Sequence, residues 1–94
     1  MVAMDGDLRG QVFELLAGEN KLGRGETNDI VLSASAISGE HAMIVQQEGI
    51  FAIVPLSEKN PVFVNERQVD AAELRAGDTI RLGETSFRFQ TTEN

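Results

Sequence analysis

The chain has 94 residues, 24% of them charged, a formal net charge of −7 at pH 7, and no cysteine. A chain this short forms one compact domain. Without cysteine it has no disulfide framework, thiolate zinc site or cysteine nucleophile. No apolar stretch is long enough to cross a bilayer, and the acidic excess disfavours binding to nucleic acid. We expect one cytoplasmic domain over residues 1–94, with a core of about 10–90, loose ends at 1–7 and 91–94, and no nucleic-acid or membrane partner.

Short apolar stretches separated by turn residues follow one another along the chain. Glycine, asparagine and aspartate dominate the separating segments, as expected for tight turns. Helical periodicity is weak, and its best example, Asp70–Arg75, is long enough for only a single turn. We expect strands at residues 11–17, 21–23, 29–32, 41–47, 50–56, 62–65, 68–69, 79–82 and 86–90.

Many short strands in a small chain predict an all-β sandwich or barrel. The β-branched and aromatic side chains then pack between the sheets, and functional residues lie on loops. We expect the core to contain Phe13, Leu15, Ile30, Leu32, Ile44, Ile53, Val62, Val64, Ile80, Leu82, Phe87 and Phe89.

Ser38 and His41 are the best candidates for catalysis, because a serine near a histidine suggests a nucleophile and its base. They have neither the G-x-S-x-G pattern nor the strand–turn–helix context of a nucleophile elbow. We therefore favour a structural histidine and no catalytic residue, with a hydrolase as the minor alternative. A single histidine and scattered carboxylates give no metal-ligand pattern, so we expect no metal and no cofactor.

Gly23-Arg24-Gly25 is a second candidate feature. Its glycines allow a sharp turn and a close approach of the backbone to a ligand. It lacks the remaining residues of a phosphate-binding P-loop. Taken alone, the motif is more typical of a hairpin turn that carries a solvated arginine.

Six short blocks of sequence occur in a specific order between residues 11 and 90. The blocks are LGRG (22–25), NDIVL (28–32), ISGEHA (37–42), NPVFVN (60–65), LRAGDTI (74–80) and LG (82–83). Together they resemble a forkhead-associated (FHA) domain. The resemblance implies an eleven-stranded β-sandwich of two twisted, mainly antiparallel sheets. It also implies a non-enzymatic module that binds phosphothreonine-containing proteins or peptides, such as a Ser/Thr kinase or its substrate, as a monomer or weak dimer.

The resemblance assigns a binding role to four residues. Arg24 would contact the phosphate through charge-assisted hydrogen bonds, and the Ser38 hydroxyl would donate to a phosphate oxygen. Asn60 would hold the peptide backbone, because an amide both donates and accepts. Lys59 would reach the phosphate, although a solvated loop lysine is equally compatible with the sequence.

Three further residues would support this phosphopeptide site. By the same resemblance, Gly23 would keep the arginine loop closely packed. His41 would brace the Ser38 loop, and Asn65 would shape the turn after Val64.

Some positions depart from the family pattern. Gly39 stands where many members carry a basic residue, and Glu58 brings negative charge close to the expected phosphate. Pro61-Val62 replaces a common glycine-threonine pair, and Pro55 replaces a frequent aspartate. These changes predict a weaker or more selective pocket, with compensation of Gly39 by Lys59 as a hypothesis. They also leave open a phosphate-independent scaffold or self-association domain of the same fold.

Overall fold

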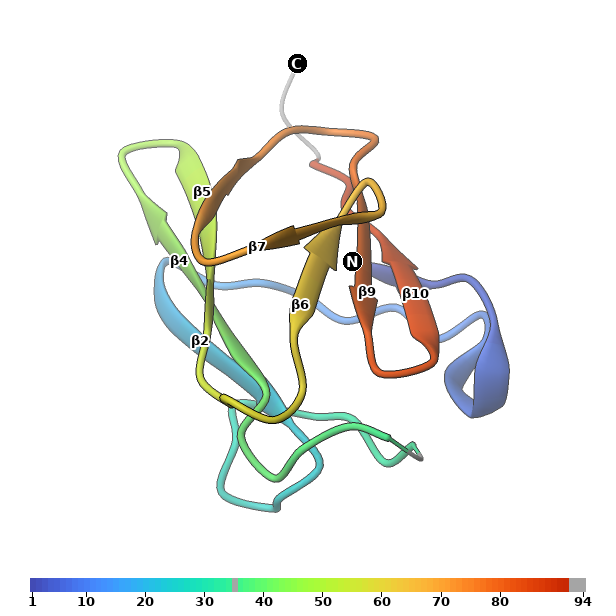
Figure 1. Ribbon diagram of the computed structural model, residues 1–94. Helices are drawn as coiled ribbons and strands as arrows, with labels where there is room; N and C mark the ends of the chain where they lie inside the picture. The colour runs from blue at the N-terminus through green and yellow to red at the C-terminus, as the bar shows by residue number, and fades with distance from the viewer. Residues whose placement is uncertain (35, 92–94) are drawn as a thin grey trace.

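The computed structural model describes residues 1–34 and 36–91. Ten strands form two five-stranded sheets that face each other (Figure 1). The first sheet contains, in spatial order, β1 (Val2–Ala3), β10 (Thr85–Arg88), β9 (Thr79–Leu82), β6 (Val62–Val64) and β7 (Arg67–Val69). The second contains β3 (Ile30–Val31), β2 (Gly18–Gly23), β4 (Ala42–Gln47), β5 (Ile50–Pro55) and β8 (Ala72–Leu74). All neighbouring pairs are antiparallel except β2 and β3.

The expected sandwich is confirmed, but the described residues contain ten strands rather than eleven. The predicted strand over 11–17 is reduced to an isolated bridge between Val12 and Val2. Phe13 exchanges backbone hydrogen bonds with Met1, and there the ladder ends. The segment is therefore extended but too little paired to count as a strand.

Two other expectations are wrong. The predicted helical turn over Asp70–Arg75 contains β8, because residues 72–74 pair with β5. That pairing outweighs the helix propensity of an alanine- and leucine-containing segment. Residues 1–7 are not a loose end, since β1 pairs with β10 and Met1 and Ala3 are buried. A short 3₁₀ helix, η1 (Gly6–Leu8), follows β1. Of the other predicted loose end, residues 92–94 lie outside the described residues.

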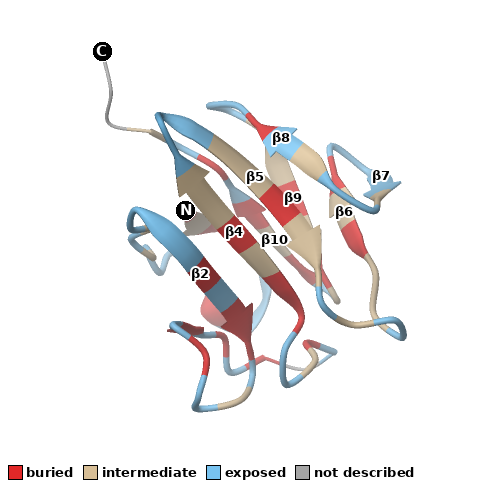
Figure 2. Cartoon of the chain, turned by 90° about the vertical axis from the view of Figure 1, so that its left-hand side faces the viewer, coloured by how far each residue is buried: buried red, intermediate tan, exposed pale blue. Residues whose placement is uncertain are grey.

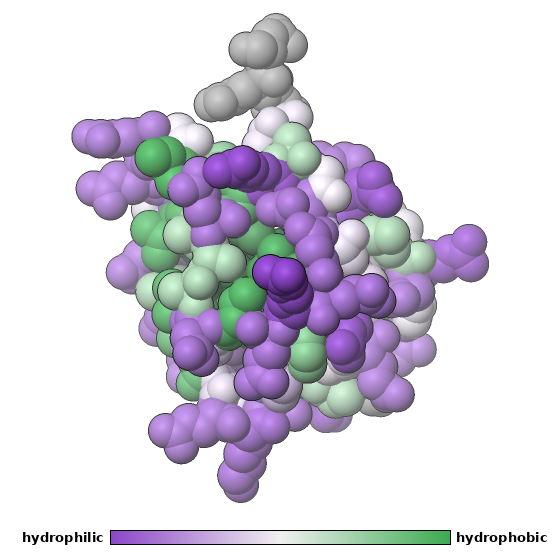
Figure 3. Space-filling view, turned by 45° about the horizontal axis from the view of Figure 1, so that its top comes forward, coloured by the Kyte–Doolittle hydropathy of each residue, from purple (hydrophilic) through white to green (hydrophobic). Residues whose placement is uncertain are grey.

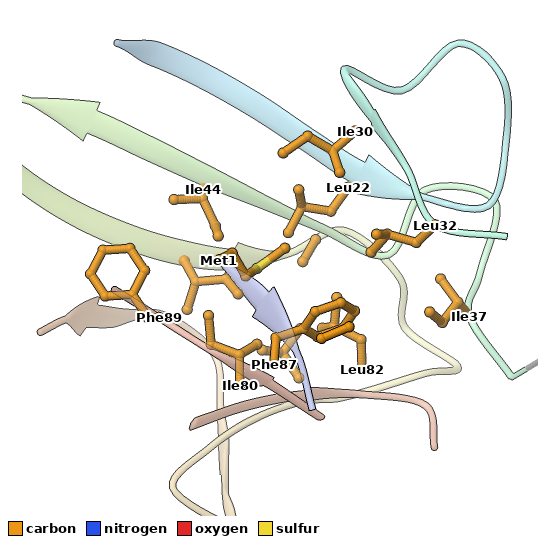
Figure 4. Packing of buried hydrophobic residues seen from close by; sticks show 14 of the residues in the cluster. Met1, Leu22, Ile30, Leu32, Ile37, Ile44, Ile80, Leu82, Phe87 and Phe89 are labelled. Atoms are coloured by element: carbon orange, nitrogen blue, oxygen red, sulfur yellow. The ribbon is translucent and has the colours of Figure 1, made fainter. Parts of the chain in front are cut away.

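The core lies between the two sheets, as Figure 4 shows for Phe87, Phe89, Ile80 and their neighbours. Ten of the twelve predicted core residues are buried, whereas Phe13 and Leu15 are only partly buried at its margin. Phe13 makes an edge-on contact with Phe87 at a centroid distance of 6.2 Å. The short strands therefore form a packed scaffold from which the loops project.

The loops between β2 and β4 and the loop between β5 and β6 gather at one end of the sandwich, at the bottom of Figure 1. The β4–β5 hairpin turn lies at the opposite end. This turn uses Glu48 and Gly49, both with positive φ, which matches the twist of a two-residue hairpin. The loop end contains most of the residues that the sequence singled out.

Candidate phosphopeptide site

Two loops are joined by their backbones at the end of β2. The Arg24 N–H donates to the Ser38 carbonyl over 2.9 Å, and the Gly25 N–H donates to the Gly39 carbonyl over 3.1 Å. A Cβ atom at Gly23 would lie 2.3 Å from the Gly39 oxygen, a distance that only glycine avoids. Gly23 thus permits the approach that holds the Arg24 and Ser38 backbones side by side.

The side chain of Asn28 reinforces this junction. Its Nδ2 donates to the Gly25 carbonyl over 2.7 Å and to the Gly39 carbonyl over 2.5 Å, one on each loop. Asn28 is 7% exposed, and its Oδ1 has no hydrogen-bond partner among the described residues. Sequence reasoning missed this residue. The available signal was a polar, turn-favouring amide three residues after Gly25, within a glycine-rich loop.

A second cluster joins the Ser38 loop to the β5–β6 loop. The Asn60 Nδ2 donates to the Ser38 hydroxyl, and the Ser38 and Ser57 hydroxyls lie 3.1 Å apart. The Ser57 hydroxyl also accepts from the Asn60 backbone N–H over 3.1 Å. The structure therefore brings Ser38 and Asn60 together, as the resemblance implies, and adds Ser57 to them.

Ser57 was missed because its role depends on a contact between segments 19 residues apart in the sequence. The local signal was its spacing from Asn60, since a serine hydroxyl often accepts from a backbone N–H three residues ahead. Ser57 supplies a hydroxyl one position before Glu58.

His41 is fully buried and links the same two loops. Its Nδ1 accepts from the Ser38 backbone N–H over 3.2 Å, and its Nε2 lies 3.1 Å from the Pro61 carbonyl. The ring must be neutral, with its proton on Nε2, to accept at one nitrogen and donate at the other. Both nitrogens are used on backbone groups, so His41 is not arranged as a base for the Ser38 hydroxyl.

Burial lowers the pKa of His41 from 6.5, and the hydrogen bond to Pro61 opposes that shift only in part. The neutral form that the loops require is therefore the form that burial favours.

Arg24 is joined to Ser38 through its backbone, and Lys59 precedes Asn60 in the chain. Both side chains are exposed, and neither forms an ion pair among residues 1–34 and 36–91. Glu58, next to Lys59, is also exposed. The two cations are thus available to an anion in solution.

Asn65 lies apart from the cluster, at the other end of β6 (Figure 1). It has a φ of 51° and begins the β6–β7 turn. Its side chain accepts from the Thr79 N–H over 2.9 Å and donates to Asp78 over 3.0 Å. Asn65 therefore shapes a turn and fastens it to β9, and does not contact the cluster.

A groove of about 480 Å³ opens beside the cluster. The β5–β6 loop lines one side through Ser57 and Glu58, and β7 lines the other through Gln68 and Val69. Within the described residues, no group of three or more histidine, cysteine or carboxylate side chains could hold a metal ion. The arrangement presents hydroxyls, an amide and two exposed cations, with a groove next to Ser57.

A family model described as the FHA domain matches residues 20–83, about two thirds of the chain. The chain belongs to the FHA domain family. Over 82 residues, or 86% of the chain, it is 38% identical to the transcriptional regulatory protein EmbR of Mycobacterium tuberculosis. That alignment spans only 21% of EmbR, so this FHA chain corresponds to about a fifth of its relative's length.

Solved structures agree with this assignment. An FHA domain from a study of phosphothreonine-dependent FHA interactions superposes with a TM-score of 0.89 and 27% identity, covering 99% of this chain and 95% of that one. M. tuberculosis EmbR in complex with a low-affinity phosphopeptide superposes with a TM-score of 0.80 and 32% identity, covering 94% of this chain and 24% of that one.

The lowered pKa of His41 predicts a stability that depends on pH. The unfolded chain takes up a proton as the pH falls through 6.5, and the folded FHA domain takes it up only at lower pH. The contribution of His41 to the free energy of unfolding should be constant above pH 6.5 and should decrease below it. Urea unfolding between about pH 8 and about pH 5 measures this decrease.

His41→Gln is the matched control. Glutamine can donate to the Pro61 carbonyl and accept from the Ser38 N–H, but it does not titrate. This variant should have a flatter stability profile between about pH 6.5 and pH 5. An unchanged profile would show that other groups cause the pH dependence.

Proposed function

We propose that this FHA domain binds phosphothreonine-containing peptides of a partner protein, such as a Ser/Thr kinase or its substrate, and performs no chemistry on them. The observation that carries the proposal is the joining of three loops so that Ser38 and Asn60 form one cluster next to Arg24, which forms no ion pair within the part of the chain that the structure describes. Arg24, Ser38, Lys59 and Asn60 are the binding residues, and Gly23 and His41 hold the loops that carry them.

The charge of the domain makes this local arrangement necessary. A phosphate ester carries a charge of about −1.5 to −2 and three strong acceptor oxygens. A domain with a net charge of −7 repels such a group at long range. Binding must therefore come from short-range contacts with Arg24, Lys59 and the hydroxyl cluster.

The hydrogen bond between the Ser38 and Ser57 hydroxyls can change direction when phosphate binds. A hydroxyl hydrogen rotates freely, so the contact between Ser38 and Ser57 can be donated from either side. If Ser57 donates, Ser38 accepts from both Ser57 and Asn60, and its own hydrogen is directed at the ligand. Ser57 thus acts as a positioning residue for the Ser38 hydroxyl.

The groove next to Ser57 would receive the peptide on one side of the phosphothreonine. Glu58 at its rim favours a peptide without acidic residues there. Gly39 adds no cation to the site, in keeping with a selective rather than a strongly attractive pocket.

Two observations suit a cytoplasmic location. The chain has no cysteine, and among the described residues no helix has the length and apolar character that spanning a bilayer requires. A cytoplasmic domain would also have access to intracellular kinases and their substrates.

Replacement of Arg24 tests the proposed function directly. Arg24→Ala should weaken binding to phosphothreonine peptides by about ten- to a hundred-fold, because it removes a charge-assisted contact. Arg75→Ala is the control, since Arg75 is also exposed but lies near the β8–β9 turn. Fluorescence anisotropy with peptides selected from a labelled phosphothreonine library measures both. Equal affinity of wild type for a selected peptide and its unphosphorylated twin would contradict the proposal.

Replacement of Ser57 tests the positioning role. Ser57→Ala removes a hydroxyl that can donate to Ser38 and that accepts from the Asn60 backbone N–H. It should weaken phosphopeptide binding by about three- to tenfold. Ser57→Thr keeps the hydroxyl and should restore most of the affinity. Ser86→Ala serves as the control. It removes a hydroxyl from β10, on the side of the first sheet that faces away from the core. Wild-type affinity in Ser57→Ala would exclude the role.

A further inference from the structure

The central strands of the second sheet are apolar on both faces. On β4 and β5, Ile44 and Ile53 are buried in the core, as the alternation of strand side chains requires. The outward positions are apolar too, and Met43, Val45 and Val54 are only half-buried. An antiparallel sheet with one solvated face normally alternates apolar with polar residues. This pattern indicates a second contact surface.

The strand register arranges the outward side chains in two rows. One row runs from Lys21 on β2 through Met43 to Val54, and the other from Glu19 through Val45 and Ala52 to Glu73. We call these seven residues the outer face. Figure 2 views the sheet from this side, with the half-buried positions in tan along β4 and β5.

Two further exposed apolar side chains lie on the same side of the sheet, one beyond each row. Ile50, at the start of β5, is 53% exposed, and Val31 on β3 is 39% exposed. Figure 3 shows apolar residues reaching the surface on its left-hand side, among mostly hydrophilic neighbours. Contiguous apolar surface of this kind marks interaction sites more often than scattered residues do.

We propose that the outer face packs against the outer face of a second copy of this chain, about a two-fold axis that runs across the strands between the two rows. Such an axis exchanges the rows. It places Met43 against the partner's Val45 and Val54 against the partner's Ala52. It also places Lys21 opposite the partner's Glu19, and by symmetry it forms this ion pair twice.

The charges select this axis. A two-fold axis along the strands would instead oppose Glu19 to the partner's Glu73, two like charges at a closing interface. Lys21 is available for a new partner, because its side chain is 46% exposed and its contact with Glu40 is long, at 3.9 Å. The outer face is therefore complementary to itself in one orientation and repulsive in the other.

The dimer should be weak. The outer face spans only the central strands of a small sheet, and two copies of charge −7 repel each other at long range. Association is expected at high protein concentration or where the domain is locally concentrated. The proposal does not depend on phosphopeptide binding, because no binding residue belongs to the outer face.

Sedimentation velocity over about 10 µM to about 1 mM protein tests for the dimer. Wild type should show a concentration-dependent dimer. Val45→Asp should weaken it by at least about tenfold, since it buries an unpaired charge in the interface. A wild-type monomer at every concentration, or a dimer that Val45→Asp leaves intact, would overturn the proposal. Circular dichroism melting checks that Val45→Asp is folded. If it is not, Ala52→Asp, which also places a charge on the outer face, is measured in its place.

A charge swap tests the axis. Lys21→Glu alone and Glu19→Lys alone should each weaken the dimer, and the double variant should restore it towards wild-type strength. Arg88→Glu is the control for Lys21→Glu. It makes the same change in net charge, but on β10 of the first sheet. Failure of the double variant to restore association, or equal weakening by Arg88→Glu, would contradict this pairing.

Discussion

The candidate site depends on the close approach of two loops at Gly23 and Gly39. Only a residue without a Cβ fits at position 23, and Asn28 links the two loops by donating to a carbonyl on each. This approach fixes the Arg24 backbone beside the Ser38 backbone. A site made of mobile loops would have to order them when it bound, and that cost would reduce its affinity. The hydrogen bonds across the loops reduce this cost in advance.

His41, which is fully buried, also joins two loops. Its neutral ring holds the Ser38 loop to the β5–β6 loop through two backbone groups, and the Ser38, Ser57 and Asn60 side chains join those loops again nearer the surface. The only titratable group in this scaffold is kept uncharged by burial. Among the residues assigned to the site, only Arg24 and Lys59 therefore carry positive charge, and both are exposed to a ligand anion. If the outer face forms the proposed dimer, each assembly would present two such sites.

The fold could be predicted because it depends on local patterns, whereas the residues assigned to the candidate site could be named only from the resemblance to the FHA family. Alternating apolar residues and turn residues indicated the strands, and the order of short motifs indicated Arg24, Ser38 and Asn60. Asn28 and Ser57 could not be found in this way, since each acts through a loop distant in the sequence. The segment 70–75 was misread because its pairing with β5 outweighs its helical composition. β1 was missed because two residues give no periodicity, and their partner lies more than 80 residues away.

The central claim is that one cluster at the loop end of the sandwich recognises the phosphate. The most direct test is to map amide chemical shifts in the ¹⁵N-labelled domain during titration with a selected phosphothreonine peptide, its phosphoserine analogue and its unphosphorylated twin. The account predicts saturable shifts at Arg24, Ser38, Ser57 and Asn60 with the phosphothreonine peptide and none with the unphosphorylated peptide. Shifts centred elsewhere on the domain, or the same shifts without phosphate, would contradict it.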